Sequence, residues 1–413
     1  MDFEALSRTA LSAYFETHGV VRHQLESFDH FVDVMLPQII TENSDVVATV
    51  GDRTHTLKFS RVCMPPPTIR ESDGFVRAVQ GPAEAMARNL SYASAVLVDV
   101  LHTVDTAEGE RLKSDMYREV VLCKIPVMVR SRYCYLSSRV GDLSSCVYDS
   151  GGYFVINGLE KTLIAQQKLR TNCAFVWPAT AQSRATLCCE VRSCHEQKLR
   201  STSTLVLHLM PGNADHPPHI TVSLPFLETT VNLIALFKLL GCATLEAMVD
   251  ACGAHSGAHG ALVTATVRDI LIEGMEPETA EEIFVQVGDR GTTETTRQRR
   301  DRYMTHILNN EVLPHMGLGD APQTRAAKTL YLGHMVHRLM LVHLGLRPVD
   351  DRDHFKLKRV DAPGHLCSLL FRQLFRAFLK SLNSQLLRTL SSPHRQLSVP
   401  KLVMARKITS GFK

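Results

Sequence analysis

The chain concentrates its strand-like and its helix-like hydrophobic patterns in different parts of its 413 residues. Runs rich in apolar and β-branched residues, the pattern of buried strands, are concentrated before residue 225. They cover 91–103, 119–129, 186–191, 203–209 and 220–224. Helical spacing of apolar residues dominates after that point. This separation predicts an α+β fold, and the length predicts two or three domains.

The first 170 residues also carry more local signals. Apolar residues recur at helical spacing over 10–37, and 45–57 is typical of a hairpin. Gly151 and Gly152 open a predicted strand over 153–157. The segment 160–168 is then predicted to form a short helix or a turn.

The second half is predicted to contain helices over 231–240 and 324–344. Between them, the small residues of 250–260 are typical of a loop. The charge run 297–302 is expected to lead into a helix over 303–313.

The segment 371–388 has the clearest amphipathic pattern of the chain. Its apolar face consists of Phe371, Leu374, Phe375, Phe378, Leu382 and Leu386. Arg372, Arg376 and Lys380 lie four residues apart on the other side and form a basic stripe. Such a stripe fits a solvated face as well as a contact with DNA.

Charge is distributed unevenly along the chain. Residues 362–413 contain nine basic and no acidic side chains, whereas the remaining residues hold 37 basic and 42 acidic ones. A mildly acidic body that ends in a basic segment favours a polyanion partner at that end, and nucleic acid is the first interpretation. The alternative is a basic face that docks on an acidic protein.

The eleven cysteines are scattered without a C-x-x-C pair, which favours reduced thiols in an intracellular protein. Acidic residues occur early in the N-terminal segment, which lacks a long apolar core, so no secretory signal is expected. No uncharged apolar stretch reaches about 18 residues, and a membrane span is not expected.

Two groups of Cys and His residues could suggest zinc. The first consists of Cys242, Cys252, His255 and His259, and the second of Cys188, Cys189, Cys194 and His195. The first lacks the second well-spaced pair that zinc usually requires, and the second is better explained by buried strand thiols. No metal site is therefore predicted.

Motifs for catalysis are also missing. Gly151, Gly152 and Gly158 with Lys161 match neither common phosphate-binding loop, and no nucleophile motif occurs. The dense acidic run 350–353 is interleaved with basic residues, which favours a salt-bridged or capping turn. No catalytic residue is predicted.

The run Asp149–Gln167, DSGGYFVINGLEKTLIAQQ, resembles the signature of the second-largest (β-type) subunit of multisubunit DNA-dependent RNA polymerases. Other blocks with this resemblance follow the family's order. They are 22–32, 70–73, 87–99, 124–136, 224–225, 307–315, 331–344, 350–364 and 405–413. Their style is that of nuclear, archaeal or large-DNA-virus polymerases rather than bacterial ones. Leu159 and Thr162 depart from the expected signature.

The resemblance implies a protrusion domain of mixed sheet and helices, with a lobe domain inserted into it. The protrusion would cover 1–168 and 357–413, and the lobe 169–356. The acid-free segment would then be the returning half of the protrusion, which faces the DNA–RNA hybrid. A full-length subunit would continue past Lys413 into the fork region, the hybrid-binding domain, the wall and a zinc-bearing anchor.

By the same resemblance, the chain is an N-terminal part of the subunit and acts only in the assembled DNA-directed RNA polymerase. The implied partners are the largest subunit, the rest of the second-largest subunit, the DNA template and the DNA–RNA hybrid. The catalytic Mg²⁺ would be held by the largest subunit, so no cofactor is expected in this chain. The implied location is the nucleus, or the cytoplasm or virion for a viral protein.

The candidate nucleic-acid contacts are basic side chains. Lys161 follows the signature strand and can present a point charge to a phosphate, although a solvated turn residue is the alternative. The further candidates are Lys168, Arg170, Arg372, Arg376, Lys380, Arg406, Lys407 and Lys413. The signature residues Gly151, Gly152, Asn157 and Gly158 are expected to make turns, and one of Tyr153 and Phe154 is expected in the core.

Two functions stay open at this point. In the first, the chain is one part of a split second-largest subunit that lines the nucleic-acid cleft during transcription. In the second, it is a stand-alone protrusion–lobe module that binds nucleic acid or a polymerase without catalysis. A companion sequence that begins with fork-like residues would favour the first.

Overall fold

The computed structural model describes the chain in segments that form two compact units. The described residues are 3–71, 73–79, 81–106, 110–138, 146, 148–195, 202–212, 218–253, 260–273, 279–292, 296–391 and 398–413. Unit 1 combines Met1–Gln166 with Val360–Lys413, and unit 2 is Gln167–Arg359. The assignment of these units to a protrusion and a lobe stays a prediction.

Unit 1 contains helices from both ends of the chain. They are α1 (Phe3–His18), α2 (Arg22–His30), the π-helix η1 (Phe31–Met35), α3 (Leu36–Glu42), α4 (Pro82–Ala87), the 3-10 helix η2 (Tyr135–Ser138), α11 (Pro363–Leu390), α12 (Val399–Val403) and α13 (Arg406–Gly411). Its strands are β1 (Asp45–Val50), β2 (Arg53–Cys63), β3 (Thr68–Arg70), β4 (Val76–Ala78), β5 (Ala93–Thr106), β6 (Arg111–Pro126), β7 (Phe154–Ile156) and β8 (Leu159–Lys161). The paired strands β9 (Gln166–Leu169) and β15 (Lys358–Asp361) lie where the chain passes from one unit to the other.

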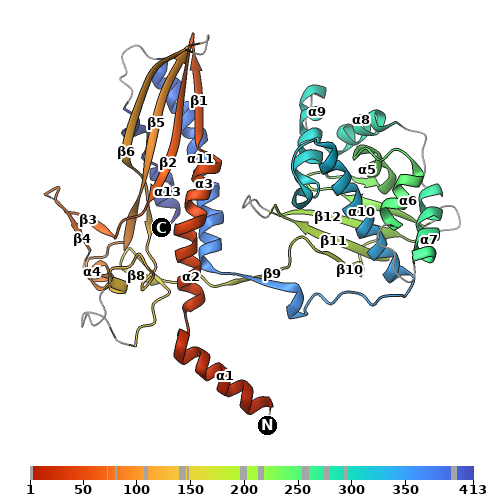
Figure 1. Ribbon diagram of the computed structural model, residues 1–413, viewed down its shortest axis with the longest axis horizontal. Coiled ribbons are helices and arrows are strands. Elements are labelled where there is room, and N and C mark those ends of the chain that lie inside the picture. The colour runs from red at the N-terminus through yellow and green to blue at the C-terminus, as the bar shows by residue number, and fades with distance from the viewer. Residues whose placement is uncertain are drawn as a thin grey trace. The chain divides into compact units, whose positions relative to one another are not determined.

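An antiparallel sheet in the order β1-β2-β5-β6 forms the centre of unit 1, and α11 runs along it (Figure 1). Phe371 and Phe375 of α11 are fully buried, and Phe375 packs edge to face on Phe59 of β2. Helix α2 crosses α11 at Gly364, where a Cβ atom would overlap the carbonyl group of Ser27. Only glycine permits so close an approach of two helix backbones.

Unit 2 consists of a second sheet and the helices that cover it. The strands are β10 (Ala174–Pro178), β11 (Leu187–Ser193), β12 (Ser203–Met210), β13 (His219–Ser223) and β14 (Thr230–Asn232). The helices are α5 (Leu233–Leu239), α6 (Leu245–Gly253), α7 (Gly260–Glu273), α8 (Ala280–Gly291), α9 (Arg297–His306), the π-helix η3 (Ile307–Glu311), the 3-10 helices η4 (Pro314–Met316) and η5 (Phe355–Leu357), and α10 (Pro322–His343).

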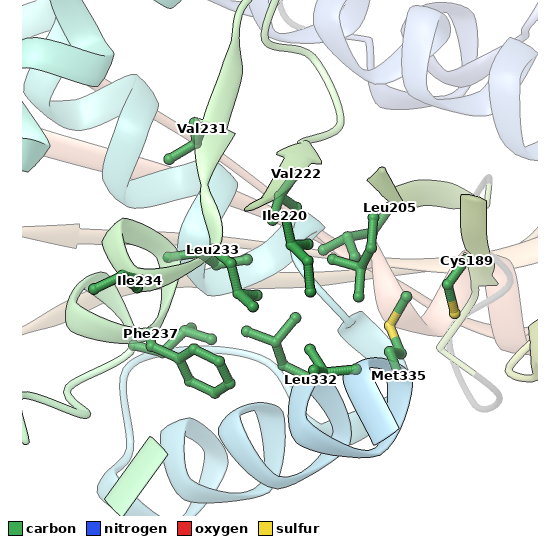
Figure 2. Packing of buried hydrophobic residues seen from close by; sticks show 14 of the residues in the cluster. Cys189, Leu205, Ile220, Val222, Val231, Leu233, Ile234, Phe237, Leu332 and Met335 are labelled. Atoms are coloured by element: carbon green, nitrogen blue, oxygen red, sulfur yellow. The ribbon is translucent and has the colours of Figure 1, made fainter. Parts of the chain in front are cut away.

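The core of unit 2 lies between one face of this antiparallel sheet and α10. Along β12 the side chains of Leu205, Leu207 and Leu209 are buried in the core, as the two-residue period of a strand requires. Figure 2 shows Leu332 and Met335 of α10 pointing toward the sheet residues from the opposite side. In unit 2, the strands from β10 onward and the helices that follow them thus meet in one core.

These observations confirm the α+β fold and most of the predicted elements. The hairpin over 45–57 forms as β1 and β2, and the long helical patterns form α10 and α11. The sequence patterns did not reveal β10, whose residues 174–177 are buried. Because these residues are buried consecutively, they lack the alternation that marks a half-exposed strand.

The prediction of a helix or turn over 160–168 is wrong. Leu159–Lys161 forms β8 and Gln166–Leu169 forms β9. Asn157 and Gly158, with φ of +51° and +79°, turn the chain from β7 directly into β8. Two adjacent residues with positive φ are typical of a two-residue hairpin turn, whose twist matches that of paired strands.

The loop predicted over 250–260 is wrong at its start, because α6 continues to Gly253 and buries Cys252. The residues 254–259, including His255 and His259, lie outside the described residues. The charge run 297–302 does not precede a helix but forms the first turns of α9. Arginine and glutamine are good helix formers, and only one side of α9 is buried, at Met304.

Candidate nucleic-acid interface

The signature segment 149–161 is held in unit 1 mainly by its backbone. Tyr92 donates its backbone N–H to the carbonyl of Val155 at 2.9 Å, and Val129 donates to Tyr153 at 2.8 Å. Gly158 donates to the carbonyl of Leu90 at 3.0 Å. These bonds fix the position of the hairpin formed by β7 and β8.

The glycines of the signature occupy backbone positions that other residues would strain. Gly151 has φ of +73°, and a Cβ there would lie 2.5 Å from the carbonyl oxygen of Val129. Gly158 has φ of +79°, and a Cβ would lie 2.7 Å from the Asn89 side chain. Gly152 also has positive φ and faces Val21. Their backbone conformation and close packing therefore account for these glycines without a ligand.

The two aromatic residues of the signature have different environments. Phe154 is buried and packs edge to face on Phe28, with 5.6 Å between ring centres. Tyr153 is half-buried and donates its hydroxyl to Asp149 at 2.9 Å. Burial and this hydrogen bond raise the pKa of the Tyr153 hydroxyl above its ordinary value. Asn157 donates its backbone N–H to the Ser91 hydroxyl at 3.0 Å.

Lys161 lies at the end of β8, opposite Phe154, and its side chain is exposed. No ion pair or hydrogen bond joins its ammonium group to another described residue. Two exposed apolar side chains, Leu159 and Ile164, lie near it in the sequence. The hairpin can therefore present a positive charge to a phosphate, but its surroundings are partly apolar.

The end of the chain presents further cations on a fixed support. Ala405 donates its N–H to the carbonyl of Leu122 on β6 at 2.6 Å, and the Thr409 hydroxyl accepts from the N–H of Lys124 at 3.0 Å. Ile408 is fully buried. Arg406, Lys407 and Lys413 of this segment are exposed. Because the apolar side of α13 is anchored, its cations point to solvent.

The basic stripe predicted on α11 is wrong for one of its members. Arg376 and Lys380 are exposed, but Arg372 is only 5% exposed and its guanidinium lies 2.9 Å from the carboxylate of Glu42 on α3. Helix α11 packs against α2 and α3 as well as the sheet, so more than one of its sides is buried. Arg372 is an internal ion-pair partner and not a candidate for nucleic acid.

The remaining candidates lie where the chain passes between the units. Lys168 is half-buried in β9, and Arg170 just after it is exposed. The β7–β8 hairpin that carries Lys161 packs against α4 and β6, and α13 packs against β6 and α11.

The acidic run 350–353 forms a salt-bridged turn, as predicted. The carboxylate of Asp350 accepts from Arg338 at 3.2 Å, from Arg347 at 2.8 Å and from the N–H of Val176 at 2.8 Å. Asp353 lies 3.2 Å from the ammonium of Lys358. Within the described segments, no group of three or more His, Cys, Asp or Glu residues could hold a metal ion. Their helices include none that is both long and apolar enough to cross a membrane.

Sequence reasoning also missed a buried charge in unit 2. Lys328 on α10 is 1% exposed, and its ammonium donates to the carbonyls of Leu308 and Asn309, each at 2.9 Å. Burial lowers the pKa of Lys328 to about 8. The signal available in the sequence was a single Lys among the apolar positions of a helix.

The comparison with known families identifies the chain. A model described as RNA polymerase beta subunit matches residues 19–410. The chain belongs to this family. The match confirms the resemblance seen in the signature segment and extends through nearly all of both units.

Relatives from several kinds of organism agree. The chain is 32% identical to "DNA-directed RNA polymerase II subunit 2" of Arabidopsis thaliana over 98% of the chain and 35% of that protein. It is 30% identical to "DNA-directed RNA polymerase subunit Rpo2" of Sulfolobus acidocaldarius over 98% of the chain and 34% of that protein. Its identity to "DNA-directed RNA polymerase subunit Rpo2N" of Methanocaldococcus jannaschii is 28%, over 98% of the chain and 79% of that protein. The chain therefore corresponds to an N-terminal part of a second-largest subunit, and spans about a third of the first two relatives.

Proposed function

We propose that this protein lines the nucleic-acid cleft of a DNA-directed RNA polymerase as the protrusion and lobe of its second-largest subunit. Unit 1 is assigned to the protrusion and unit 2 to the lobe. The observation that carries the proposal is the family match over 19–410, which includes both units. In this proposal the chain works only in an assembled polymerase, inside the cell, where DNA is transcribed.

The proposal assigns the chemistry of nucleotide addition to other chains. Phosphoryl transfer depends on metal ions held by carboxylates. The described carboxylates provide no such group, and Asp350 and Asp353 of the dense run form ion pairs with Arg338, Arg347 and Lys358. The proposed partners are the largest subunit, which would hold Mg²⁺, and the polypeptide that supplies the rest of the second-largest subunit.

The proposed contribution of this chain is to position nucleic acid. Arg406, Lys407 and Lys413 project from a segment whose other side is buried, so their charges are held on a fixed surface. Lys161 adds a charge on the β7–β8 hairpin. Arg376 and Lys380 remain exposed candidates on α11. Contacts of this kind fix the register of a duplex without reading its sequence.

The relative from Methanocaldococcus jannaschii favours a divided subunit over a stand-alone module. The chain covers 79% of that protein, whereas it covers about a third of the longer relatives. A polypeptide of similar extent therefore occurs among the polymerase subunits of this family. Recovery of the native protein as a monomer, without any polymerase polypeptide, would instead support the stand-alone module.

The proposed interface can be tested by the salt dependence of binding to a DNA–RNA hybrid. Each neutralised phosphate lowers log affinity by about 0.9 per unit of log salt, so three to five contacts predict a loss of about 40-fold to 500-fold between 50 and 200 mM salt. A variant with Lys161, Arg406 and Lys407 replaced by Ala should flatten the slope by up to about 2.7. Fluorescence anisotropy measures both slopes.

The matched control replaces three other exposed cations, Lys58, Arg118 and Arg184, by Ala. This variant carries the same net charge as the first, but should keep the slope of the unmodified protein. Equal slopes in the two variants would show that only total charge matters. An unchanged slope in the first variant would assign its three residues to a protein contact.

A further inference from the structure

One end of the main sheet of unit 1 brings two histidines together. His55 on β2 and His102 on β5 are diagonal neighbours, since the register pairs Leu57 with His102 and His55 with Val104. His55 shares its side of β2 with Leu57 and Phe59, the side that packs on α11. Nδ1 of His55 lies 3.1 Å from Nε2 of His102, and the ring planes are 19° apart. His102 is only 4% exposed.

This geometry is that of an N–H···N hydrogen bond between two imidazoles. One facing nitrogen must carry the proton, and the other must accept it. The pair therefore holds its hydrogen bond only while at least one ring is neutral. Among the described residues, no third ligand joins the pair to form a metal site. In either tautomer, one of the two outer ring nitrogens is left as an N–H donor.

The histidines line a cavity of about 630 Å³ at this end of the sheet. Its polar lining comes from Arg53, His55 and His102 and, on β6, from Lys113, Asp115 and Tyr117. Lys113 and Asp115 neutralise each other, with 2.7 Å between Nζ and Oδ2. The Arg53 guanidinium and the Tyr117 hydroxyl form no hydrogen bond or ion pair with another described residue. Leu390 is the lining residue that α11 supplies.

The cavity is thus rich in donors and carries a net positive charge. Burial lowers the pKa of both histidines. Arg53 lowers the pKa of His55 further, and His55 and Lys113 lower that of His102, whereas Asp115 acts in the opposite direction. Asp115, the acidic residue of the lining, is already paired with Lys113, so a proton added to the neutral pair lacks a full counter-charge. An anion from solution would supply that charge.

We propose that this cavity binds a tetrahedral oxyanion, of the phosphate or sulfate type, and that the His55–His102 pair takes up a proton on binding. The anion would accept hydrogen bonds from the Arg53 guanidinium, the Tyr117 hydroxyl and the outer N–H of the pair. Bonds between ionised donors and an oxyanion are the strong ones. The site goes beyond the proposed function, because it uses none of the residues assigned to the hybrid.

Proton uptake gives the site a defined pH dependence. Above the pKa values of the free pair, each anion bound requires one proton from solution, so affinity should fall by up to about tenfold per pH unit. Sulfate is the appropriate first probe, because it does not titrate near neutral pH. Inorganic phosphate and an oligonucleotide without a terminal phosphate then distinguish a free anion from an internucleotide phosphate.

The experiment follows the imidazole proton resonances of His55 and His102 by NMR in the full chain. Sodium sulfate is titrated at constant ionic strength from pH 6 to 8, and His55→Gln assigns the signals. The expected result is that sulfate raises the titration midpoints of both histidines and binds more weakly as pH rises. Arg53→Ala should weaken binding by about tenfold or more, the value of one charged hydrogen bond.

Lys58→Ala is the matched control, since it removes an exposed cation from the same strand on the opposite face. It should leave the sulfate affinity unchanged. The proposal is overturned if sulfate does not move the histidine midpoints, or if Lys58→Ala and Arg53→Ala weaken binding equally. Neither result bears on the salt slope for the hybrid, so the two proposals fail separately.

Discussion

The long helix of each unit is fixed by a glycine and a buried cation, but the two cations are compensated differently. In unit 1, α11 crosses α2 at Gly364, and Arg372 forms an ion pair with Glu42. In unit 2, α10 crosses α6 at Gly333, where a Cβ would overlap Ala251. There the ammonium of Lys328 binds two backbone carbonyls and, among the described residues, no carboxylate.

The difference shows that a buried cation does not need an acidic partner. Lys328 meets carbonyls at the end of the helical segment formed by α9 and η3, where the helix dipole places partial negative charge. Arg372 depends on Glu42, which is itself 22% exposed. The lysine can instead lose its proton and still donate to both carbonyls.

Among the substitutions proposed here, Gly364→Ala should lower the free energy of unfolding the most. The added methyl group overlaps backbone atoms of α2, which cannot move aside without separating the helices. We expect the free energy of unfolding of unit 1 to fall by about 3 kcal/mol, the upper end of overpacking costs. Hydrogen exchange of unit 1 amides measures this loss in the whole chain.

Gly288→Ala on α8 is the control, because a Cβ there meets only Met304 at 3.4 Å. It should be neutral or stabilise unit 2 by up to about 1 kcal/mol through helix propensity. Gly333→Ala should resemble Gly364→Ala, but in unit 2. Equal and small effects of all three substitutions would mean that the crossings are looser than described.

Lys328→Met tests the buried cation of unit 2 and should lower the free energy of unfolding somewhat less. It leaves the carbonyls of Leu308 and Asn309 without their donor, at about 1 kcal/mol or more each, while the methionine stem keeps most of the packing. We expect unit 2 to lose about 2 kcal/mol in hydrogen-exchange measurements. Unit 1 amides serve as the internal reference and should not change.

Glu42→Gln should cost less, about 1 to 2 kcal/mol in unit 1. It leaves Arg372 buried without a counter-charge, which is costly, but the partial exposure of Glu42 admits water to the pair. Arg372→Met combined with Glu42→Gln should recover part of the loss, because the uncompensated charge is gone. If the double variant lost more free energy of unfolding than the two single variants lose in total, this account would be wrong.

The same helices show what sequence patterns can predict and what they cannot. The apolar face of α11 was predicted by its spacing, and Phe371, Phe375 and Phe378 are buried. The burial of Arg372 was not predicted, because spacing gives the direction of a face but not how many elements pack around the helix. Leu374 illustrates the same limit, since it lies against Gly411 of α13, at the other end of the acid-free segment.

The candidate interface was likewise only partly predictable from the sequence. The turn residues Asn157 and Gly158 could be located from the sequence because local backbone conformation favours particular residue types. The exposure of Lys161, Arg406 and Lys407 depends instead on what their segments pack against. The His55–His102 pair depends on the register between strands 47 residues apart, which no local pattern encodes.

The last prediction, which is specific to Lys328, is a dependence of unit 2 stability on alkaline pH. The folded-state pKa of Lys328 is about 8, below the value of about 10.4 of an unfolded lysine. Between these values the unfolded chain binds more protons than the folded one, so stability rises with pH relative to a variant without the group. Below pH 8 both states are protonated and the difference is constant. We therefore expect the loss caused by Lys328→Met to grow by about 2 kcal/mol between pH 7.5 and 10, whereas the loss caused by Glu42→Gln in unit 1 should not follow this course. Hydrogen exchange, corrected for its intrinsic pH dependence, measures the stability of the two units separately. If the loss of stability caused by Lys328→Met shrank over this range, the folded protein would stabilise the ammonium form rather than destabilise it.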